Sequence, residues 1–146
     1  MEAVRAARPE DVERCRELLT AARDESAVVR GGDLLARQAS STAARWLDSD
    51  PDRLLLVGLF DEVVVGVAVG EVVPGRLGRV GCCYVEPEAR QVGVGSGLVA
   101  GLLSWFADRG CTGVDAQALP GDRSTKQLLE TAGFKARLLI LHRRLP

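Results

Sequence analysis

Two long runs of β-branched and apolar residues in the middle of the chain constrain its fold most strongly. RLLLVGLF occupies residues 53–60 and VVVGVAVGEVV occupies residues 63–73, with only Asp61 and Glu62 between them. Such residues favour β-strands, and so short a connection joins antiparallel strands in a tight hairpin. After the turn PGRLG, the sequence RVGCCYV at residues 79–85 has the same character. We therefore predict three consecutive antiparallel strands.

Helical periodicity and shorter apolar runs surround this hairpin. Pro9 suits the first turn of a helix, and Gly110 and Gly133 stand where helix C-terminal caps belong. The order of elements predicts an α/β fold, with a mixed, mostly antiparallel central sheet and helices on both of its faces. Besides the three central strands, the expected elements are a strand near Val4, a helix through residues 12–22, a helical segment through 34–47, a helix through 98–106, a strand at 113–119, a helix through 122–132 and a strand at 134–145.

The size and charge of the chain limit its expected partners. With 146 residues, 47% of them hydrophobic, we expect a single domain over residues 1–146. The formal net charge is −1 and no segment is dominated by one sign, so neither nucleic acid nor a membrane is expected as a partner. The N-terminus lacks the apolar core of a signal peptide, which favours a cytoplasmic location. Frequent arginine, alanine, valine and glycine are typical of GC-rich bacterial genomes.

The cysteines do not form a pattern typical of a metal site. Cys82 and Cys83 are neighbours in a predicted strand, where successive side chains point to opposite faces, so they cannot bind one metal together. Cys15 lies on the apolar face of a helix, Cys111 follows a helix end, and the chain has one histidine. We expect no metal and no disulfide, but four free, mostly buried thiols.

A glycine-rich stretch, ARQVGVGSG at residues 89–97, connects the third central strand to the following helix. The first backbone N–H groups of a helix have no partner inside the helix, and the helix dipole adds positive potential there. The N–H groups of Val92 to Ser96 therefore suit a phosphate or pyrophosphate, and glycine allows close approach. A flexible turn that lets helix and sheet pack closely is the alternative.

Two other phosphate-binding motifs are excluded by spacing. A P-loop requires a lysine and a hydroxyl residue after its last glycine, whereas Leu98 and Val99 follow here. A dinucleotide fingerprint requires glycines at its first, third and sixth positions. Gly93 and Gly95 fit the first and third, but the sixth position is Leu98. A nucleotide triphosphatase is therefore excluded, and dinucleotide binding is disfavoured.

The stretch resembles the signature of the GNAT superfamily of N-acetyltransferases. In that pattern Arg or Gln is followed by two variable residues, Gly, any residue, and Gly or Ala; here it runs from Arg90 to Gly95. The preceding YVEPEA looks like the family's strand that ends in Val, a variable residue and Pro. The hairpin, GVDAQAL and LLETAGFKARLL are similar to other elements of the family. The resemblance therefore covers essentially the whole chain.

The resemblance implies acetyl-CoA as the cosubstrate. In the family, a break after the central strand splays two strands, and the pantetheine arm enters the gap between them, here between CCYV and GVDAQAL. The N–H of Val85 then stands where negative charge develops on the thioester oxygen. The implied cofactor-binding residues are Tyr84, Val85, Arg90, Gln91, Val92, Gly93, Val94, Gly95, Ser96, Asp122 and Lys126. Tyr84 could instead pack in the core or at its rim, and Lys126 could instead lie on a solvated helix face.

Three positions depart from the family's usual pattern. Leu129 replaces the tyrosine that often protonates the leaving thiolate, and residues 81–83 contain no glutamate to serve as general base. Asp122 stands where an asparagine is frequent. We take Glu86, beside the strand break, as the first candidate base and Glu71 as the second, because burial can raise a carboxyl pKa toward neutrality. A surface carboxylate is the alternative for both.

Together these features predict transfer of an acetyl group from acetyl-CoA to a primary amine by direct attack. The sequence does not identify the acceptor, which is expected to be a small molecule or a peptide. A coenzyme A-binding module without catalysis is the alternative, because the usual tyrosine and glutamate are missing. A dinucleotide-binding protein is a more distant one. A homodimer formed through the apolar segment ARLLILHRRL is also expected.

Overall fold

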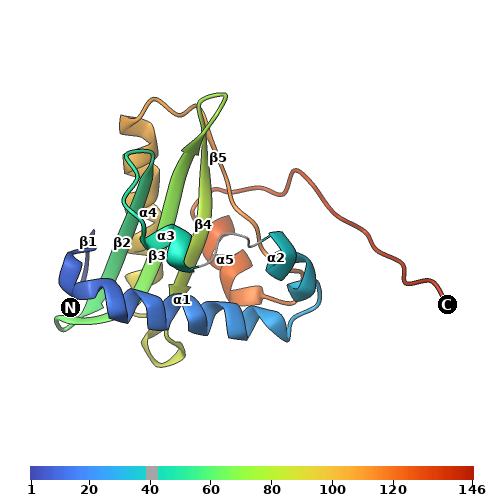
Figure 1. Cartoon of the computed structure of the whole chain (residues 1–146), viewed down its shortest axis with the longest axis horizontal. Helices are drawn as coiled ribbons and strands as arrows, with labels where there is room; N and C mark the ends of the chain where they lie inside the picture. Colours follow the sequence, from blue (N-terminus) through green and yellow to red (C-terminus); the bar gives the residue numbers. More distant parts are fainter. Residues whose placement is uncertain (39–42) are drawn as a thin grey trace.

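A computed structural model describes residues 1–38 and 43–146 and shows a mixed five-stranded sheet (Figure 1). Its strands lie in sequence order across the sheet, and each neighbouring pair is antiparallel except the last, β4 and β5, which is parallel. The strands are β1 (Glu2–Ala6), β2 (Arg53–Phe60), β3 (Val63–Val73), β4 (Leu77–Val85) and β5 (Gly113–Asp115). The predicted central antiparallel strands are thus confirmed.

The β2–β3 hairpin has the tight turn expected from its sequence. Asp61 and Glu62 both have positive φ angles, 49° and 69°, as the two central residues of a type I′ turn do. Such a turn matches the right-handed twist of the two strands that it joins. A bulge between Gly58 and Leu59 shifts the register near this end of the hairpin.

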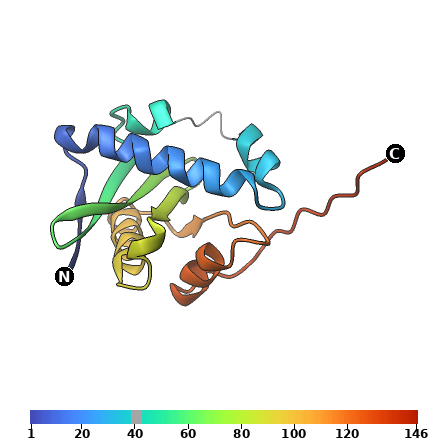
Figure 2. The same ribbon diagram turned by 90° about the horizontal axis from the view of Figure 1, so that it is seen from below.

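Helices cover both faces of the sheet, as predicted. Figures 1 and 2 show α1 on one face and α4 on the opposite face. The predicted helical segment over residues 34–47 consists of two short helices, and its central residues, 39–42, lie outside the described part. The helices are α1 (Val12–Ala27), α2 (Gly32–Gln38), α3 (Ala43–Leu47), α4 (Val94–Asp108) and α5 (Arg123–Thr131), with 3-10 turns η1 (Pro9–Asp11) and η2 (Pro87–Ala89).

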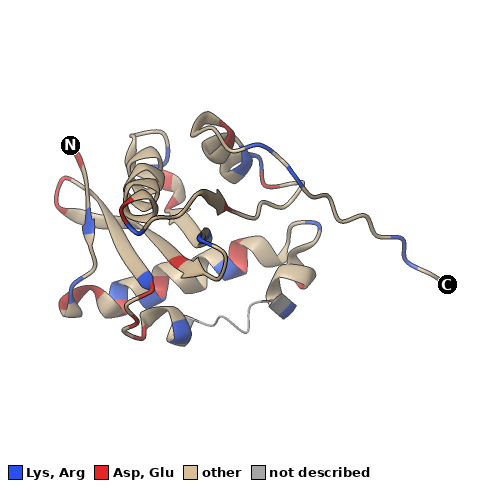
Figure 3. Cartoon of the chain, turned by 90° about the horizontal axis from the view of Figure 1, so that it is seen from above, with Lys and Arg blue, Asp and Glu red and all other residues tan. Residues whose placement is uncertain are grey.

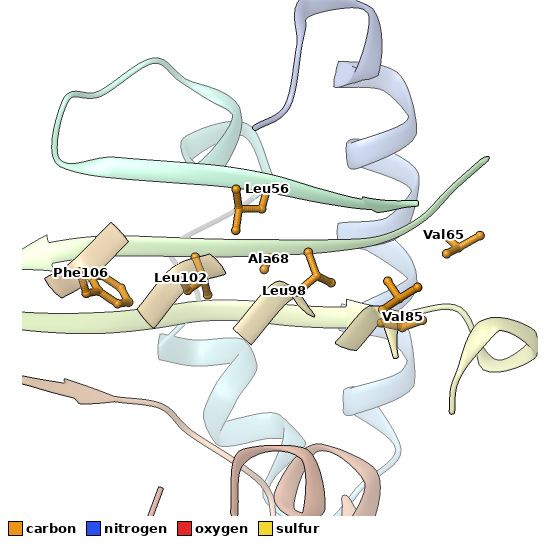
Figure 4. Packing of buried hydrophobic residues seen from close by; sticks show 8 residues of the cluster. Leu56, Val65, Ala68, Val85, Leu98, Leu102 and Phe106 are labelled. Atoms are coloured by element: carbon orange, nitrogen blue, oxygen red, sulfur yellow. The ribbon is translucent and has the colours of Figure 1, made fainter. Parts of the chain in front are cut away.

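The core consists of two apolar layers, one on each face of the sheet. Successive residues of a strand, such as Leu56 and Val57, belong to different layers, as the alternation of side chains requires. Figure 4 shows the layer beneath α4. Its buried members are Leu56, Val65, Ala68, Val85, Val94, Leu98, Leu102 and Phe106, whereas Cys15, Leu18, Leu19, Val57, Val67 and Val69 form the layer beneath α1.

Phe106 fills the far end of the layer beneath α4, against two glycines. A Cβ atom at Gly78 would lie only 2.6 Å from the Phe106 ring, and one at Gly70 only 2.8 Å from it. We expect Phe106→Ala to lower the free energy of unfolding by about 3–5 kcal/mol, because it leaves a cavity that glycine cannot fill. Urea denaturation measures this, with the exposed Ser104→Ala on the same helix as control. A loss below about 1 kcal/mol would contradict this packing.

The C-terminal segment differs from the sequence-based prediction. Residues 134–146 form neither helix nor strand and extend away from the body of the protein (Figure 1). The predicted strand at 134–145 is therefore wrong within this single copy, and only residues 113–115 of the predicted strand at 113–119 are confirmed. A strand requires a paired neighbour, and β5, only three residues long, offers little edge to pair with.

Charged residues of both signs are interspersed over the surface, for example along α1 (Figure 3). Exposed ion pairs such as Arg37 with Asp33 and Lys126 with Glu130 join side chains of the same helix. Within the described residues, no helix combines the length and the hydropathy needed to cross a bilayer.

Candidate cofactor and active site

The site begins at the end of β4, where the strand leaves its partner β3. The N–H of Glu86 donates to the carbonyl of Val65 at 2.9 Å, which makes Gly66 and Val85 a non-hydrogen-bonded pair of the ladder. The N–H and C=O of Val85 therefore point away from β3, toward the side of β4 that faces β5. Pro87 then begins η2 and ends the strand. This is the break that the sequence predicted.

On that side, β4 has almost no neighbouring strand. Pairing with β5 runs only from Leu77 with Gly113 to Arg79 with Asp115. A cavity of about 80 Å³ opens where the two segments separate. Its lining comprises residues 80–83 of β4, Ala116 and Gln117 after β5, Thr125, Leu128 and Leu129 of α5, and Leu35 of α2. The predicted gap between CCYV and GVDAQAL is therefore present.

The glycine-rich loop presents a row of free N–H groups. Gln91 and Gly93 have φ angles of 71° and 89°, and Gly97 makes the first helical hydrogen bond, to Gly93 at 3.0 Å. Among the described residues, the N–H groups of residues 92–96 have no backbone or side-chain acceptor. Backbone that alternates in hand before a helix N-terminus forms an anion-binding concavity. The loop therefore has the geometry expected for binding a phosphate.

Residues of α5 lie next to this loop. A Cβ at Gly95 would contact Leu128 at 3.3 Å, so the helix that carries Asp122 and Lys126 lies beside the loop. Asp122 caps α5 by accepting from the N–H of Thr125 at 3.1 Å and from its hydroxyl at 2.7 Å. Lys126 lies 3.9 Å from Glu130. A direct cofactor contact of Asp122 or Lys126 remains a prediction.

Arg90, at the start of the loop, contacts three residues of β4 and α1. Its Nε donates to the carbonyl of Val85 at 2.9 Å, and its Nη2 lies 2.9 Å from both carboxylate oxygens of Glu25 on α1. Its guanidinium carbon is 5.5 Å from the ring centre of Tyr84. Glu25 was not predicted from the sequence, because it lies 65 residues from Arg90 and belongs to no local motif.

Tyr84 packs on the α1 face rather than into the cavity. Its half-buried side chain lies against the layer that contains Cys15 and Leu18. Burial raises the pKa of the Tyr84 hydroxyl, and the carboxylate of Glu25 raises it further. Tyr84 thus packs at the rim of this layer, and a contact of Tyr84 with the cofactor remains a prediction.

Both candidate bases form ion pairs with arginine. Glu86 is 2.5 Å from Nη2 of Arg14 and lies next to Val85. Glu71 is 3.0 Å from Nη2 of Arg45 and 3.7 Å from Nη2 of Arg53, with 12% of its side chain exposed. On β3, Glu71 lies five residues from Gly66, which pairs with Val85 at the strand break, and Glu71 itself pairs with Arg79. Glu71 is therefore roughly 17 Å from the break. Glu86 is therefore the candidate brought close to Val85, and the role of each carboxylate as base remains a prediction.

The cavity contains neither of the usual acid and base groups. Leu129, at the position of the usual tyrosine, is buried and contributes to the lining. Cys82 and Cys83 point to opposite layers, as predicted, and burial raises the pKa of each thiol to about 12. Both thiols therefore stay neutral near pH 7. The described residues contain four free cysteines, and no group of three or more of their His, Cys, Asp and Glu side chains is placed to hold a metal.

Solved structures of several acetyltransferases are similar to this chain over nearly its whole length. The aminoglycoside N-acetyltransferase AAC(6')-Iy in complex with a coenzyme A bisubstrate analogue has 21% identity and a TM-score of 0.69, covering 99% of each chain. Ribosomal-protein-alanine N-acetyltransferase from Brucella melitensis has 18% identity and a TM-score of 0.71, covering 100% of each chain. PaiA N-acetyltransferase from Thermoplasma acidophilum with coenzyme A has 16% identity and a TM-score of 0.75, covering 94% of this chain and 91% of its own.

At these identities the structures establish the shared fold, and the predicted α/β class is confirmed. No curated protein matches the sequence. The sequence model of the acetyltransferase (GNAT) family, by contrast, matches residues 12–134, which include the strand break, the glycine-rich loop and α5. This chain therefore belongs to the GNAT acetyltransferase family.

Proposed function

We propose that this chain is a single N-acetyltransferase domain that transfers the acetyl group of acetyl-CoA to a primary amine of a small molecule or peptide. One observation carries the proposal: the outward-facing N–H and C=O of Val85 lie on the same open side of β4 that the cavity borders. The free N–H groups of residues 92–96 follow after η2, at the start of α4. The family and the coenzyme A held by two of the similar structures are consistent with acetyl-CoA.

The binding of acetyl-CoA follows from these backbone groups. The pyrophosphate accepts hydrogen bonds from the N–H groups of residues 92–96, as anions do at helix N-termini. The pantetheine arm takes the place of a strand beside β4. There the N–H of Val85 is the donor for the thioester end of the arm, and the Val85 carbonyl, which also accepts from Nε of Arg90 at 2.9 Å, is an acceptor with one lone pair left. The thioester then lies beside the N–H of Val85, next to the cavity whose lining includes Cys83.

The reaction forms a C–N bond and breaks a C–S bond. The amine nitrogen attacks the thioester carbonyl carbon, negative charge develops on the carbonyl oxygen, and the N–H of Val85 is the donor that we assign to it. Coenzyme A leaves as the thiolate, which requires little protonation, because a thiol has a pKa of about 8.5. The attacking ammonium must lose its proton, and we assign that step to Glu86, with Glu71 as the second candidate.

A coupled assay of thiol release tests this function. Purified protein is incubated with acetyl-CoA and an amine panel that includes an aminoglycoside and a peptide with an N-terminal alanine, since these two chemistries are named among the similar structures. Mass spectrometry then identifies the acetylated product. Thiol release without an acetylated amine indicates hydrolysis. Coenzyme A binding without any turnover would support the alternative of a non-catalytic module, for which the neutral cavity lining is the motivating observation.

The exposed C-terminal segment supports the homodimer expected from the sequence. Leu138, Leu139, Ile140 and Leu141 are 61–90% exposed, and their residue type suits a strand covered on both faces. Because β5 is the last strand in the order, its outer edge has no neighbouring strand in the described part of the chain. We expect light scattering at micromolar concentration to give a dimer mass, and Leu139→Asp together with Leu141→Asp to shift it toward the monomer. A monomer mass for the wild type would reject this.

A further inference from the structure

Arg90 folds back onto the segment between Val85 and the glycine-rich residues 92–96, which we call the phosphate loop. The N–H of Ala89 donates to the carbonyl of Glu86 at 2.9 Å, and the N–H of Arg90 donates to the carbonyl of Pro87 at 3.4 Å. The Arg90 side chain then turns back to the carbonyl of Val85. This geometry fixes the direction in which the chain enters Gln91, whose positive φ of 71° is uncommon for a residue with a side chain.

Glu25 determines where the Arg90 side chain lies. Glu25 is on the last turns of α1, and both of its carboxylate oxygens accept from Nη2 of Arg90, with 44% of the Glu25 side chain and 30% of the Arg90 side chain exposed. The Tyr84 ring lies beneath the guanidinium and adds a cation–π contact. The guanidinium is therefore held between α1 and β4, with its Nε on the carbonyl of Val85.

We propose that Glu25 is a positioning residue of the coenzyme A site: by fixing Arg90, it holds the Val85 carbonyl and the following phosphate loop in the geometry that receives the cofactor. The inference rests on the proposed binding of coenzyme A beside β4. Preorganised groups lose less conformational entropy when a ligand binds, so the contribution of Glu25 is to affinity. If Glu25 instead held Arg90 away from the coenzyme A phosphates, removing Glu25 would free Arg90 to bind them, and coenzyme A would bind more tightly.

Tyr84 provides a readout that is independent of the cofactor. It is the single tyrosine of the chain, so tyrosinate absorbance during a pH titration reports on this one residue. Burial raises the Tyr84 pKa most, Glu25 raises it further, and Arg90 lowers it. Removing the Glu25 charge should therefore lower the Tyr84 pKa if the carboxylate lies where the structure places it.

The test compares Glu25→Gln with Glu13→Gln, a matched change on the same helix. Glu13 has an 83% exposed side chain and is 3.7 Å from Arg16, remote from Arg90 in the network described above. In calorimetric titrations with coenzyme A, we expect Glu25→Gln to raise Kd about tenfold, the equivalent of one lost charge-assisted hydrogen bond. We expect KM for acetyl-CoA to rise with it and kcat to stay within about twofold. Glu25→Asp keeps the charge and should restore part of the affinity.

The outcomes separate this inference from the function on which it rests. A lower Tyr84 pKa and a raised Kd in Glu25→Gln, with neither change in Glu13→Gln, would support it. An unchanged or lower Kd in Glu25→Gln, when the wild type binds coenzyme A, would overturn it while leaving the proposed function intact. A wild-type protein that does not bind coenzyme A would overturn the proposed function, and the positioning role with it.

Discussion

Gly93→Asp should abolish measurable coenzyme A binding while the protein remains folded. Gly93 has a φ of 89° and lies within the row of free N–H groups at residues 92–96. An aspartate there adds a negative charge to the row that is to receive the pyrophosphate, and its Cβ would lie 3.3 Å from the Glu2 carboxylate. Losing two charge-assisted hydrogen bonds, at about 1.5–3 kcal/mol each, corresponds to at least about a hundredfold rise in Kd. Gly95→Glu is also expected to weaken binding, because it adds a negative charge to the same row and its Cβ would contact Leu128 of α5 at 3.3 Å.

Gly75 provides a matched control for this substitution. It has the same φ of 89° in the turn between β3 and β4, and a Cβ there would meet no atom within 4 Å. Gly75→Asp therefore carries the same charge and the same backbone strain away from the loop, and it should bind coenzyme A as the wild type does. Gly93→Asn separates charge from size and should bind better than Gly93→Asp. Wild-type affinity in a calorimetric titration of Gly93→Asp would refute a phosphate site at this loop.

The second large effect concerns proton removal from the attacking amine. An amine of the lysine type has a pKa of about 10.4, so its free form increases about tenfold per pH unit through neutrality. The cavity lining contains no tyrosine or glutamate, so we expect deprotonation of the attacking ammonium to limit the reaction. We therefore expect kcat/KM to rise with pH until the amine is free or a carboxylate-bound water removes its proton fast enough. Loss of the usual acid matters less, because thiolate is a good leaving group.

Substitution of the two candidate carboxylates tests which one carries this step. We expect Glu86→Gln to lower kcat/KM and to shift its pH profile to higher pH, because Glu86 lies next to Val85. Glu71→Gln should have the smaller effect, because Glu71 lies farther from the strand break. Glu88→Gln, an exposed neighbour on η2, is the matched control. A transfer rate independent of pH between about 6 and 9, or an unmoved profile in both variants, would show that neither carboxylate removes the proton.

The sequence predicted those features of the fold and site that depend on local chemistry. The Asp61–Glu62 turn, the break at Pro87 and the helix start at the glycine-rich loop each follow from residues within a few positions of one another. Asp122, the first residue of the helix predicted over 122–132, is the N-terminal cap of α5. Such features are determined by backbone propensity and capping, which act over short distances in the sequence.

The remaining features depend on contacts between distant parts of the chain. Arg14 meets Glu86 across 72 residues and Arg90 meets Glu25 across 65, so no local pattern indicates either pair. The segment at 134–145 has the residue types of a strand but no partner in this copy, because the outer edge of β5 is only three residues long and propensity alone does not form a strand. Of the predicted strand at 113–119, only three residues pair with β4, since the chain separates from β4 after Asp115.

Hydrogen exchange of the backbone amides with and without coenzyme A tests the central claim most directly. The claim is that the N–H groups of Val85 and of residues 92–96, which lack a partner in the described structure, bind the cofactor. We expect these amides to exchange more slowly when coenzyme A is bound, whereas Gly75 and its neighbours in the β3–β4 turn should not change. Bound coenzyme A that leaves exchange at Val85 and residues 92–96 unchanged would contradict this account of the site.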